Sequence, residues 1–292
     1  MKLLIKFNLI FVLVFLLGML GSAYVSRQLL QQHAQAEVMD HARLMMEKAL
    51  AVRAYTSEQI RPLLETQMKY TFLPQSVPAY SATEVLTQVT GKYAEYSYKE
   101  ATLNPTNPRD RAVEWEVDII NRFRNQADMK EFVGERDTPT GRQLYVARPL
   151  RIGNPACLIC HSTVAAAPKT LLDKYGPANG FGWQLNEAVG AQIVSVPMAL
   201  PLARAEQTFQ VFMGSLVGIF LAIALVLNGM LWALVIRPIT RLSKLADQVS
   251  LGDMEAPEFQ AASKDEIGVL AESLARMRRS LEQALQMLEN PQ

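Results

Sequence analysis

The stretch from Val211 to Ile236 contains no charged residue, and this limits the possible folds of the chain more than any other feature of its sequence. It is longer than the roughly 20 apolar residues that a helix needs to cross a bilayer. The basic residues Arg237, Arg241 and Lys244 follow at once, and such residues mark the cytoplasmic end of a spanning helix. The sequence therefore predicts a transmembrane helix at residues 209–236, in contact with membrane lipid, and a cytoplasmic segment after it.

The N-terminus has the same character over a shorter length. Lys2 and Lys6 precede an apolar run that ends near Val25, which fits either a signal peptide cleaved after Ala23 or an uncleaved signal anchor. We favour a transmembrane helix at residues 1–25, because the apolar run approaches spanning length. The chain is then predicted to lie in a bacterial inner membrane, with both termini in the cytoplasm and the central region in the periplasm.

Residues 26–70 have the pattern of a stalk helix. Apolar residues recur at spacings of four and three, with charged residues between them: Val38, Ala42, Met45, Ala49 and Val52. This narrow stripe either packs on the following domain or forms the seam of a dimer stalk.

Residues 71–205 have a different texture, with short elements separated by turn residues. Alternation predicts a strand at Tyr96–Glu100, and helical spacing predicts a helix from Asp110 to Arg124. A turn at Thr138–Gly141 opens a second predicted strand at Leu144–Arg148, and a further strand is predicted at Gly190–Val196. Strands flanking helices in this length indicate one compact α+β domain with an antiparallel sheet. The formal net charge of +1 shows no bias that would indicate a nucleic-acid partner.

The central region contains one motif that carries chemistry, Cys157-Leu-Ile-Cys160-His161. Two thiols at this spacing can each add to one vinyl group of a porphyrin, and the adjacent imidazole can then ligate the iron from the proximal side. The motif therefore predicts one covalently bound haem c per chain, held by Cys157 and Cys160, with His161 as the proximal iron ligand.

Three other interpretations of the motif compete with haem attachment. A structural zinc site normally needs four ligands, but the only other histidines, His33 and His41, lie far upstream. A thioredoxin-like redox pair needs no histidine after the second thiol, and a disulfide across so short a loop constrains the unfolded chain little.

Longer runs around the motif resemble the bacterial family of periplasmic c-type haem sensor domains with a PAS-like fold. These runs are Tyr96–Asp110, Gly134–Arg142, Cys157–His161 and Gly190–Met198. The resemblance implies a PAS-like pocket around the haem. It does not identify the sixth iron ligand, since the chain has only two cysteines, and the candidates are His41, Met45, Met46, Tyr80 or an open site for a small gas.

Basic side chains near the motif in sequence are candidates for contact with the haem propionates, because arginine can bind a carboxylate with two parallel hydrogen bonds. Arg136 and Arg142 are the two that we predict, although an ordinary salt bridge would explain either one as well.

Residues 237–289 resemble a HAMP signal-relay module, in which two short helices per chain pack as a dimeric four-helix coiled coil. The resemblance rests on the segments Arg237–Leu242 and Asp265–Arg279. One apolar stripe consists of Ile239, Leu242, Ala246 and Val249, and the other of Ile267, Leu270, Leu274, Met277, Leu281, Ala284 and Leu288. Neither helix can bury its stripe alone, so the pattern predicts a homodimer.

These features predict a membrane-anchored periplasmic haem sensor. It would pass the redox or gas-ligand state of the iron through the HAMP module to a separate cytoplasmic protein of the kinase, cyclase or chemoreceptor type. No enzymatic output is expected, because no histidine and no glycine-rich nucleotide loop follow the relay. The alternative is a membrane-anchored c-type cytochrome in electron transfer, which needs no relay module.

Overall fold

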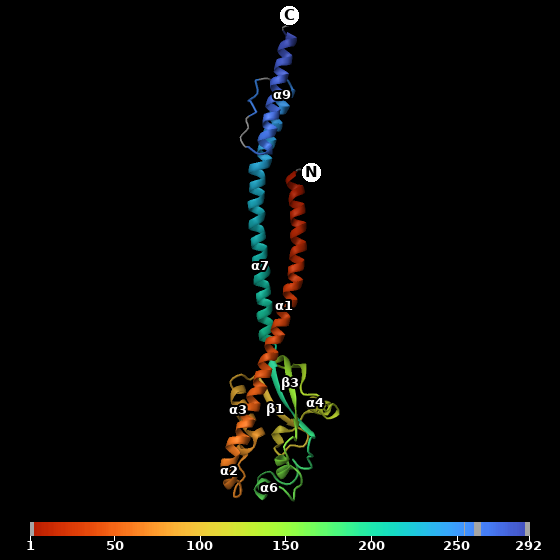
Figure 1. The fold of residues 1–292 in the computed structure, drawn as a ribbon, viewed down its shortest axis with the longest axis vertical. Helices are drawn as coiled ribbons and strands as arrows, with labels where there is room; N and C mark the ends of the chain where they lie inside the picture. Colours follow the sequence, from red (N-terminus) through yellow and green to blue (C-terminus); the bar gives the residue numbers. More distant parts are fainter. Residues whose placement is uncertain (1–2, 254, 260–263, 290–292) are drawn as a thin grey trace. The chain divides into compact units, whose positions relative to one another are not determined.

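The computed structural model describes residues 3–253, 255–259 and 264–289. The chain divides into two compact units (Figure 1). Residues 1–25 and 210–292 form the first unit, and residues 26–209 form the second.

The first unit contains the apolar parts of two long helices, α1 (Leu3–Tyr55) and α7 (Ala199–Met230). Both are long and apolar enough to cross a membrane. Phe220 of α7 stacks on Phe11 and Phe15 of α1, with ring centroids 4.8 and 3.4 Å apart. The side-chain amides of Asn8 and Asn228 exchange two hydrogen bonds of 2.7 and 2.8 Å, so each satisfies the other within these apolar segments.

The relay helices follow as α8 (Arg237–Ser250) and α9 (Glu266–Glu289). Leu242, Leu245 and Val249 of α8 are buried against Ala271 and its neighbours on α9. The stripe residues Ile239, Leu270, Met277 and Leu281 stay 39–57% exposed, so the contact between α8 and α9 uses only part of the predicted apolar surface. The predicted stripe residue Leu288 lies outside the described side chains.

The second unit is built on one antiparallel sheet. Its strands are β1 (Ser97–Thr102), β2 (Phe132–Thr138), β3 (Gly141–Arg151) and β4 (Ala188–Pro197), in the order β1-β4-β3-β2. The α+β class and the antiparallel sheet are confirmed. The edge strand β2 was not among the predicted strands, and α4 (Glu114–Asn125) begins four residues later than expected, after a short 3-10 turn at Pro108–Asp110.

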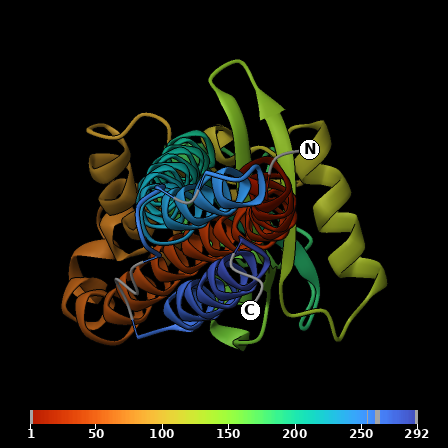
Figure 2. The ribbon, with the colours of Figure 1, turned by 90° about the horizontal axis from the view of Figure 1, so that it is seen from above.

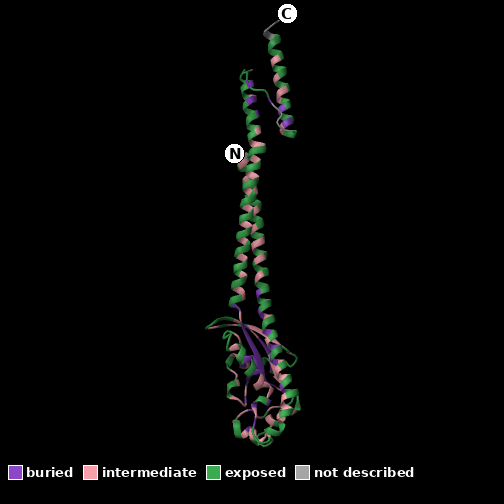
Figure 3. Ribbon diagram, turned by 90° about the vertical axis from the view of Figure 1, so that its left-hand side faces the viewer, coloured by how far each residue is buried: buried purple, intermediate pink, exposed green. Residues whose placement is uncertain are grey.

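Helices cover both faces of this sheet (Figure 2). On one face, α1 and α3 (Pro78–Thr90) pack over Leu144, Val146 and Val194. On the other face, α4 packs through Ile119, Ile120 and Phe123. Strand β4 lies in the middle of the sheet and is buried along almost its whole length (Figure 3).

The apolar stripe of residues 38–52 packs on this sheet. Val38, Ala42, Met46 and Ala49 are at most 1% exposed, and Met45 packs at the edge of the same cluster. Of the two interpretations of the stripe, packing on the following domain is the one that the structure shows.

Two wide π-helical turns interrupt the long helices, η1 (Thr56–Ile60) before α2 (Arg61–Met68) and η5 (Leu231–Ile236) before α8. In each, the residue that follows the turn donates its N–H to the carbonyl five residues earlier. A proline, Pro62 or Pro238, comes next in both cases. Proline lacks an N–H and its ring clashes with the carbonyl four residues back, so the preceding turn widens.

Candidate functional site

The two cysteines and the histidine of the motif lie on one short helical segment. It consists of the 3-10 turn η4 (Pro155–Cys157) and α5 (Leu158–His161). The side chain of Asn154 accepts a hydrogen bond of 2.8 Å from the N–H of Ala156 and caps the segment, with proline at the first position. Residues three apart lie on the same face of a helix, so Cys157 and Cys160 share one face. Both are free thiols of intermediate exposure.

The imidazole of His161 is fixed by a backbone carbonyl. Its Nδ1 lies 2.7 Å from the oxygen of Gly180, which can only accept, so Nδ1 carries the proton. Burial lowers the pKa of His161, and the bond to Gly180 opposes this only in part. The ring is therefore neutral near pH 7, and its Nε2 keeps a free lone pair.

The loop that supplies this carbonyl is held by the segment after β1. Asn104 accepts a hydrogen bond of 3.2 Å from the N–H of Gly180 and donates one of 3.3 Å to the carbonyl of Phe181. The hydroxyl of Thr106 lies 3.5 Å from Nδ1 of His161. Asn104 and Thr106 thus join the first strand of the sheet to the loop that orients the histidine.

Trp183 completes the cradle around the imidazole. Its ring stacks on His161 with the centroids 4.0 Å apart and the planes within 15° of parallel. Its backbone N–H also donates to the carbonyl of His161 at 3.1 Å. Ring orientation is therefore set from two directions, by the carbonyl of Gly180 and by the face of Trp183.

Two parts of the chain match known protein families. The sequence model of the Tll0287-like family matches residues 31–197, which is more than half of the chain. The chain belongs to the Tll0287-like family. A HAMP domain matches residues 230–283.

One solved structure is similar to part of this chain. It is the crystal structure of the cyanobacterial heme-protein Tll0287, with 15% sequence identity and a TM-score of 0.42. The match covers 55% of this chain and 95% of the other. No curated protein matches the chain. A Tll0287-like domain, two helices of membrane-spanning character and a HAMP domain together have the composition of a membrane signalling sensor.

Two arginines from the helical stalk lie near the motif of this Tll0287-like domain, and reasoning from the sequence missed both. Arg53, near the end of α1, interacts electrostatically with Cys157 and forms an ion pair with the buried Glu100. Burial raises the pKa of the Cys160 thiol, while Arg61 acts to lower it. Both arginines are more than 90 residues from the motif in sequence, so spacing could not point to them.

The predicted distal candidates on α1 are distributed along the core of the domain. Met46 is completely buried against the sheet, Met45 packs beside it, and His41 is exposed. These three residues precede Arg53 by 7 to 12 positions in the sequence, which places them about 10–18 Å from Arg53 along the helix. The guanidinium of Arg109 lies over the ring of Tyr80 on α3, 5.2 Å from the centroid of that ring. The role of these residues as iron ligands stays a prediction.

The two arginines predicted to meet propionates have other partners. Arg142 forms an exposed ion pair of 2.6 Å with Glu135 across the β2–β3 hairpin. Arg136 lies over the ring of Trp115 at 4.2 Å. Neither makes a contact with the Cys157–His161 segment among the interactions of the described residues, and their role toward a propionate stays a prediction.

Proposed function

We propose that this chain is a membrane-anchored sensor that holds one haem c in its Tll0287-like domain and passes the state of the iron through the HAMP module to a separate cytoplasmic signalling protein. The haem domain would lie in the periplasm, with both termini in the cytoplasm. The name of the similar solved protein, a cyanobacterial heme-protein, supports the choice of cofactor.

The residues of the motif fit this group. The two thiols share one face of a helical turn, at the spacing that covalent attachment to a porphyrin requires. The observation that carries the proposal is the bond from Nδ1 of His161 to the carbonyl of Gly180. Histidines that ligate metals commonly donate their other N–H to such an acceptor, which fixes the tautomer and leaves Nε2 for the metal.

Each residue then has a defined part. Cys157 and Cys160 would bind the porphyrin, and His161 would offer Nε2 to the iron. Asn104, through Gly180, would hold the histidine in place, and Trp183 would limit rotation of its ring. When bound, the haem supplies an iron that changes its charge or its axial ligand in response to redox state or a small gas.

Intact-mass spectrometry tests the attachment. Protein made in a host competent in cytochrome c maturation is expected to carry the mass of one haem, and the double variant Cys157→Ala/Cys160→Ala is expected to lack it. An unmodified polypeptide in the wild-type sample would contradict the proposal. Optical spectra of the ferric and ferrous forms, with and without carbon monoxide, then separate gas sensing from redox sensing.

The sensor role needs a separate test, because an electron-transfer cytochrome would also carry haem. Deletion of residues 238–292 removes most of the matched HAMP domain and leaves the Tll0287-like domain complete. We expect cells to lose the downstream response while the haem spectrum is retained. A response that persists without these residues would favour the cytochrome.

A further inference from the structure

A second polar site lies on the sheet face that α4 covers. The apolar contacts of α4 come from its middle and end, at Ile119, Ile120 and Phe123. Beside its first turn, the sheet and α3 border a groove of about 550 Å³. This volume lies within the range of roughly 300–1,000 Å³ that is usual for small-molecule sites.

The strands place hydrogen-bonding side chains in this groove. Ser97 of β1 pairs directly with Ser195 of β4, and Arg136 of β2 pairs with Gln143 of β3, and all four line the groove. Ser195 is only 3% exposed, and within the described part of the chain its hydroxyl has no hydrogen-bond partner. A donor in this position is available to a ligand.

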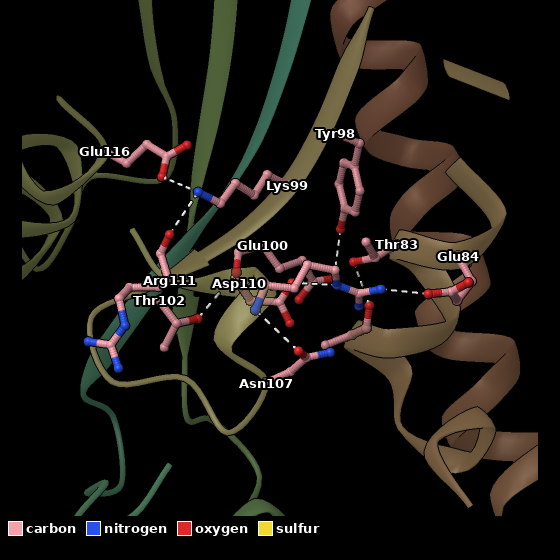
Figure 4. A network of polar contacts seen from close by, with 12 residues as sticks. Thr83, Glu84, Tyr98, Lys99, Glu100, Thr102, Asn107, Asp110, Arg111 and Glu116 are labelled. Carbon is pink, nitrogen blue, oxygen red and sulfur yellow. Dashed lines mark hydrogen bonds and ion pairs between the residues drawn. The ribbon is translucent and has the colours of Figure 1, made fainter. Parts of the chain in front are cut away.

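Most charges of the groove neutralise one another. Lys99 donates to the carboxylate of Glu116 at 2.7 Å and to the carbonyl of Arg111 at 2.8 Å (Figure 4). Arg109 forms ion pairs with Asp110 at 3.0 Å and with Glu84 at 2.5 Å. The two acids that line the groove, Asp110 and Glu116, are therefore already paired with cations.

Arg136 is the exception. No carboxylate of the described residues lies within ion-pair distance of it, and its guanidinium rests 4.2 Å from the ring centroid of Trp115. Trp115 is itself braced by Tyr145, with ring centroids 5.2 Å apart. An arginine stacked in this way presents its fork of N–H donors in a fixed plane, the geometry that suits a carboxylate.

We propose that this groove is a second ligand site, which binds a small organic monocarboxylate. Arg136 anchors the carboxylate, Ser97 and Ser195 offer hydroxyl donors, and Trp115 supplies an aromatic wall for the body of the acid. One uncompensated positive charge matches one carboxylate, which favours monocarboxylates over polyacids. A haem propionate has the same chemistry, so the test separates a free acid from a propionate.

Isothermal titration of the full chain in nanodiscs tests the site, with acetate, butyrate and benzoate as probes and benzamide as the neutral counterpart of benzoate. We expect saturable binding of at least one carboxylate, with a Kd at or below about 1 mM, and no binding of benzamide. Arg136→Gln is expected to weaken binding at least about tenfold, because the fork of guanidinium N–H donors that would bind the carboxylate is lost. Arg142→Gln, which removes an exposed arginine of the same hairpin, is expected to leave the Kd unchanged.

Two results would overturn the proposal. The first is that none of the three acids binds saturably, and the second is that binding persists unchanged in Arg136→Gln. If no free acid binds and Arg136→Gln also shifts the haem absorption or midpoint potential, the carboxylate partner of Arg136 is a propionate. Should Arg136→Gln fail to fold by circular dichroism, Ser195→Ala replaces it, with a weakened Kd expected and an unchanged Kd contradicting the proposal.

Discussion

Gly180 is the residue on which the position of His161 most directly depends. Its backbone has φ +87°, a conformation that side chains with a Cβ rarely adopt. A Cβ added there would also lie 2.9 Å from that of Thr106 and still closer to its hydroxyl. The positive φ and the missing Cβ both keep the Gly180 carbonyl in the position where it accepts a hydrogen bond from Nδ1 of His161.

Gly180→Ala should therefore lower the free energy of unfolding by more than the backbone cost alone, which is about 1–2 kcal/mol. Gly182 offers a matched control, because it has φ +81° but no atom within 4 Å of an added Cβ. Urea unfolding followed by circular dichroism would measure both variants. Equal losses for Gly180→Ala and Gly182→Ala would show that the contact with Thr106 contributes nothing.

At the scale of single residues, the sequence predicts the residues that carry the chemistry better than it predicts the residues that hold them in place. Cys157, Cys160 and His161 follow one another closely, so their spacing alone indicates what they do. Gly180, Asn104 and Thr106 lie 19 to 57 residues from His161, in segments without periodicity. Their hydrogen bonds form only when the loop that contains Gly180 packs against the segment after β1. No local sequence pattern predicts such a contact.

Among the elements, the docking of α1 on the sheet combines apolar burial with a small polar cluster. Glu131, just before β2, accepts hydrogen bonds from Arg43 of α1 at 2.8 Å and from Arg148 of β3 at 3.1 Å. Arg148 also reaches Glu47 of α1 at 2.6 Å. The cluster links the helix to two strands.

This cluster predicts a pH dependence. Burial acts to raise the pKa of Glu131, but the bonds from Arg43 and Arg148 outweigh it and leave the pKa below the ordinary value of 4.5. The folded state thus binds the proton less tightly than the unfolded state, so the stabilisation is present above about pH 4.5 and is lost as pH falls further. Glu131→Gln should cost about 1 kcal/mol at pH 7 and less at pH 3, measured by urea unfolding.

Glu135 provides the comparison for this prediction. It lies on β2, the strand that follows Glu131, and among the described residues it pairs only with Arg142, whose side chain is 60% exposed. Glu135→Gln should leave the free energy of unfolding within experimental error at both pH values. A pH-independent loss in Glu131→Gln would mean that packing, and not charge, accounts for its effect.

The amide pair between α1 and α7 predicts a coupling within the first unit. Replacing either Asn8 or Asn228 by leucine leaves the other amide without its partner on the neighbouring helix, whereas the double variant removes both amides. A double-mutant cycle on helix separation, measured by steric trapping in bilayers, should give a coupling of about 0.6–2 kcal/mol. Ser215→Ala is the control, because among the described residues that hydroxyl bonds only the Phe212 carbonyl of its own helix. Additive losses for the two asparagines would contradict the prediction.

The strands show where sequence patterns succeed and fail. The central strand β4 and the neighbouring β3 each contain a short, largely apolar run, which is typical of a buried strand. Strand β2 reads Phe-Val-Gly-Glu-Arg-Asp-Thr, with only two apolar side chains at its start, because it is an edge strand with an exposed side. Its position depends on pairing with β3, which the local composition does not reveal.

For the whole molecule, the homodimer stays a prediction, and the exposed part of the relay stripe provides a test of it. Met277 is 57% exposed and Leu270 43% exposed, although both lie on the predicted stripe. A cysteine at Met277 should therefore cross-link two copies in membranes when Cys157 and Cys160 are replaced by alanine.

Glu272 is the control position for cross-linking, because it lies off the stripe and is 63% exposed. Glu272→Cys should form little covalent dimer under the same oxidising conditions, as judged by non-reducing electrophoresis. Cross-linking at Glu272→Cys without cross-linking at Met277→Cys would mean that the copies do not meet along this stripe.

The wide turn at Leu231–Ile236 affects how the length of this protein can vary. A π-turn holds one residue more than an α-turn, so a single deletion there would restore ordinary helical geometry and keep α8 facing the same way. The same deletion inside α7 would rotate every later residue by about 100°. Single-residue deletions that spare signalling should therefore gather just ahead of Pro238, at the one place in this helix where a residue is in surplus among those described.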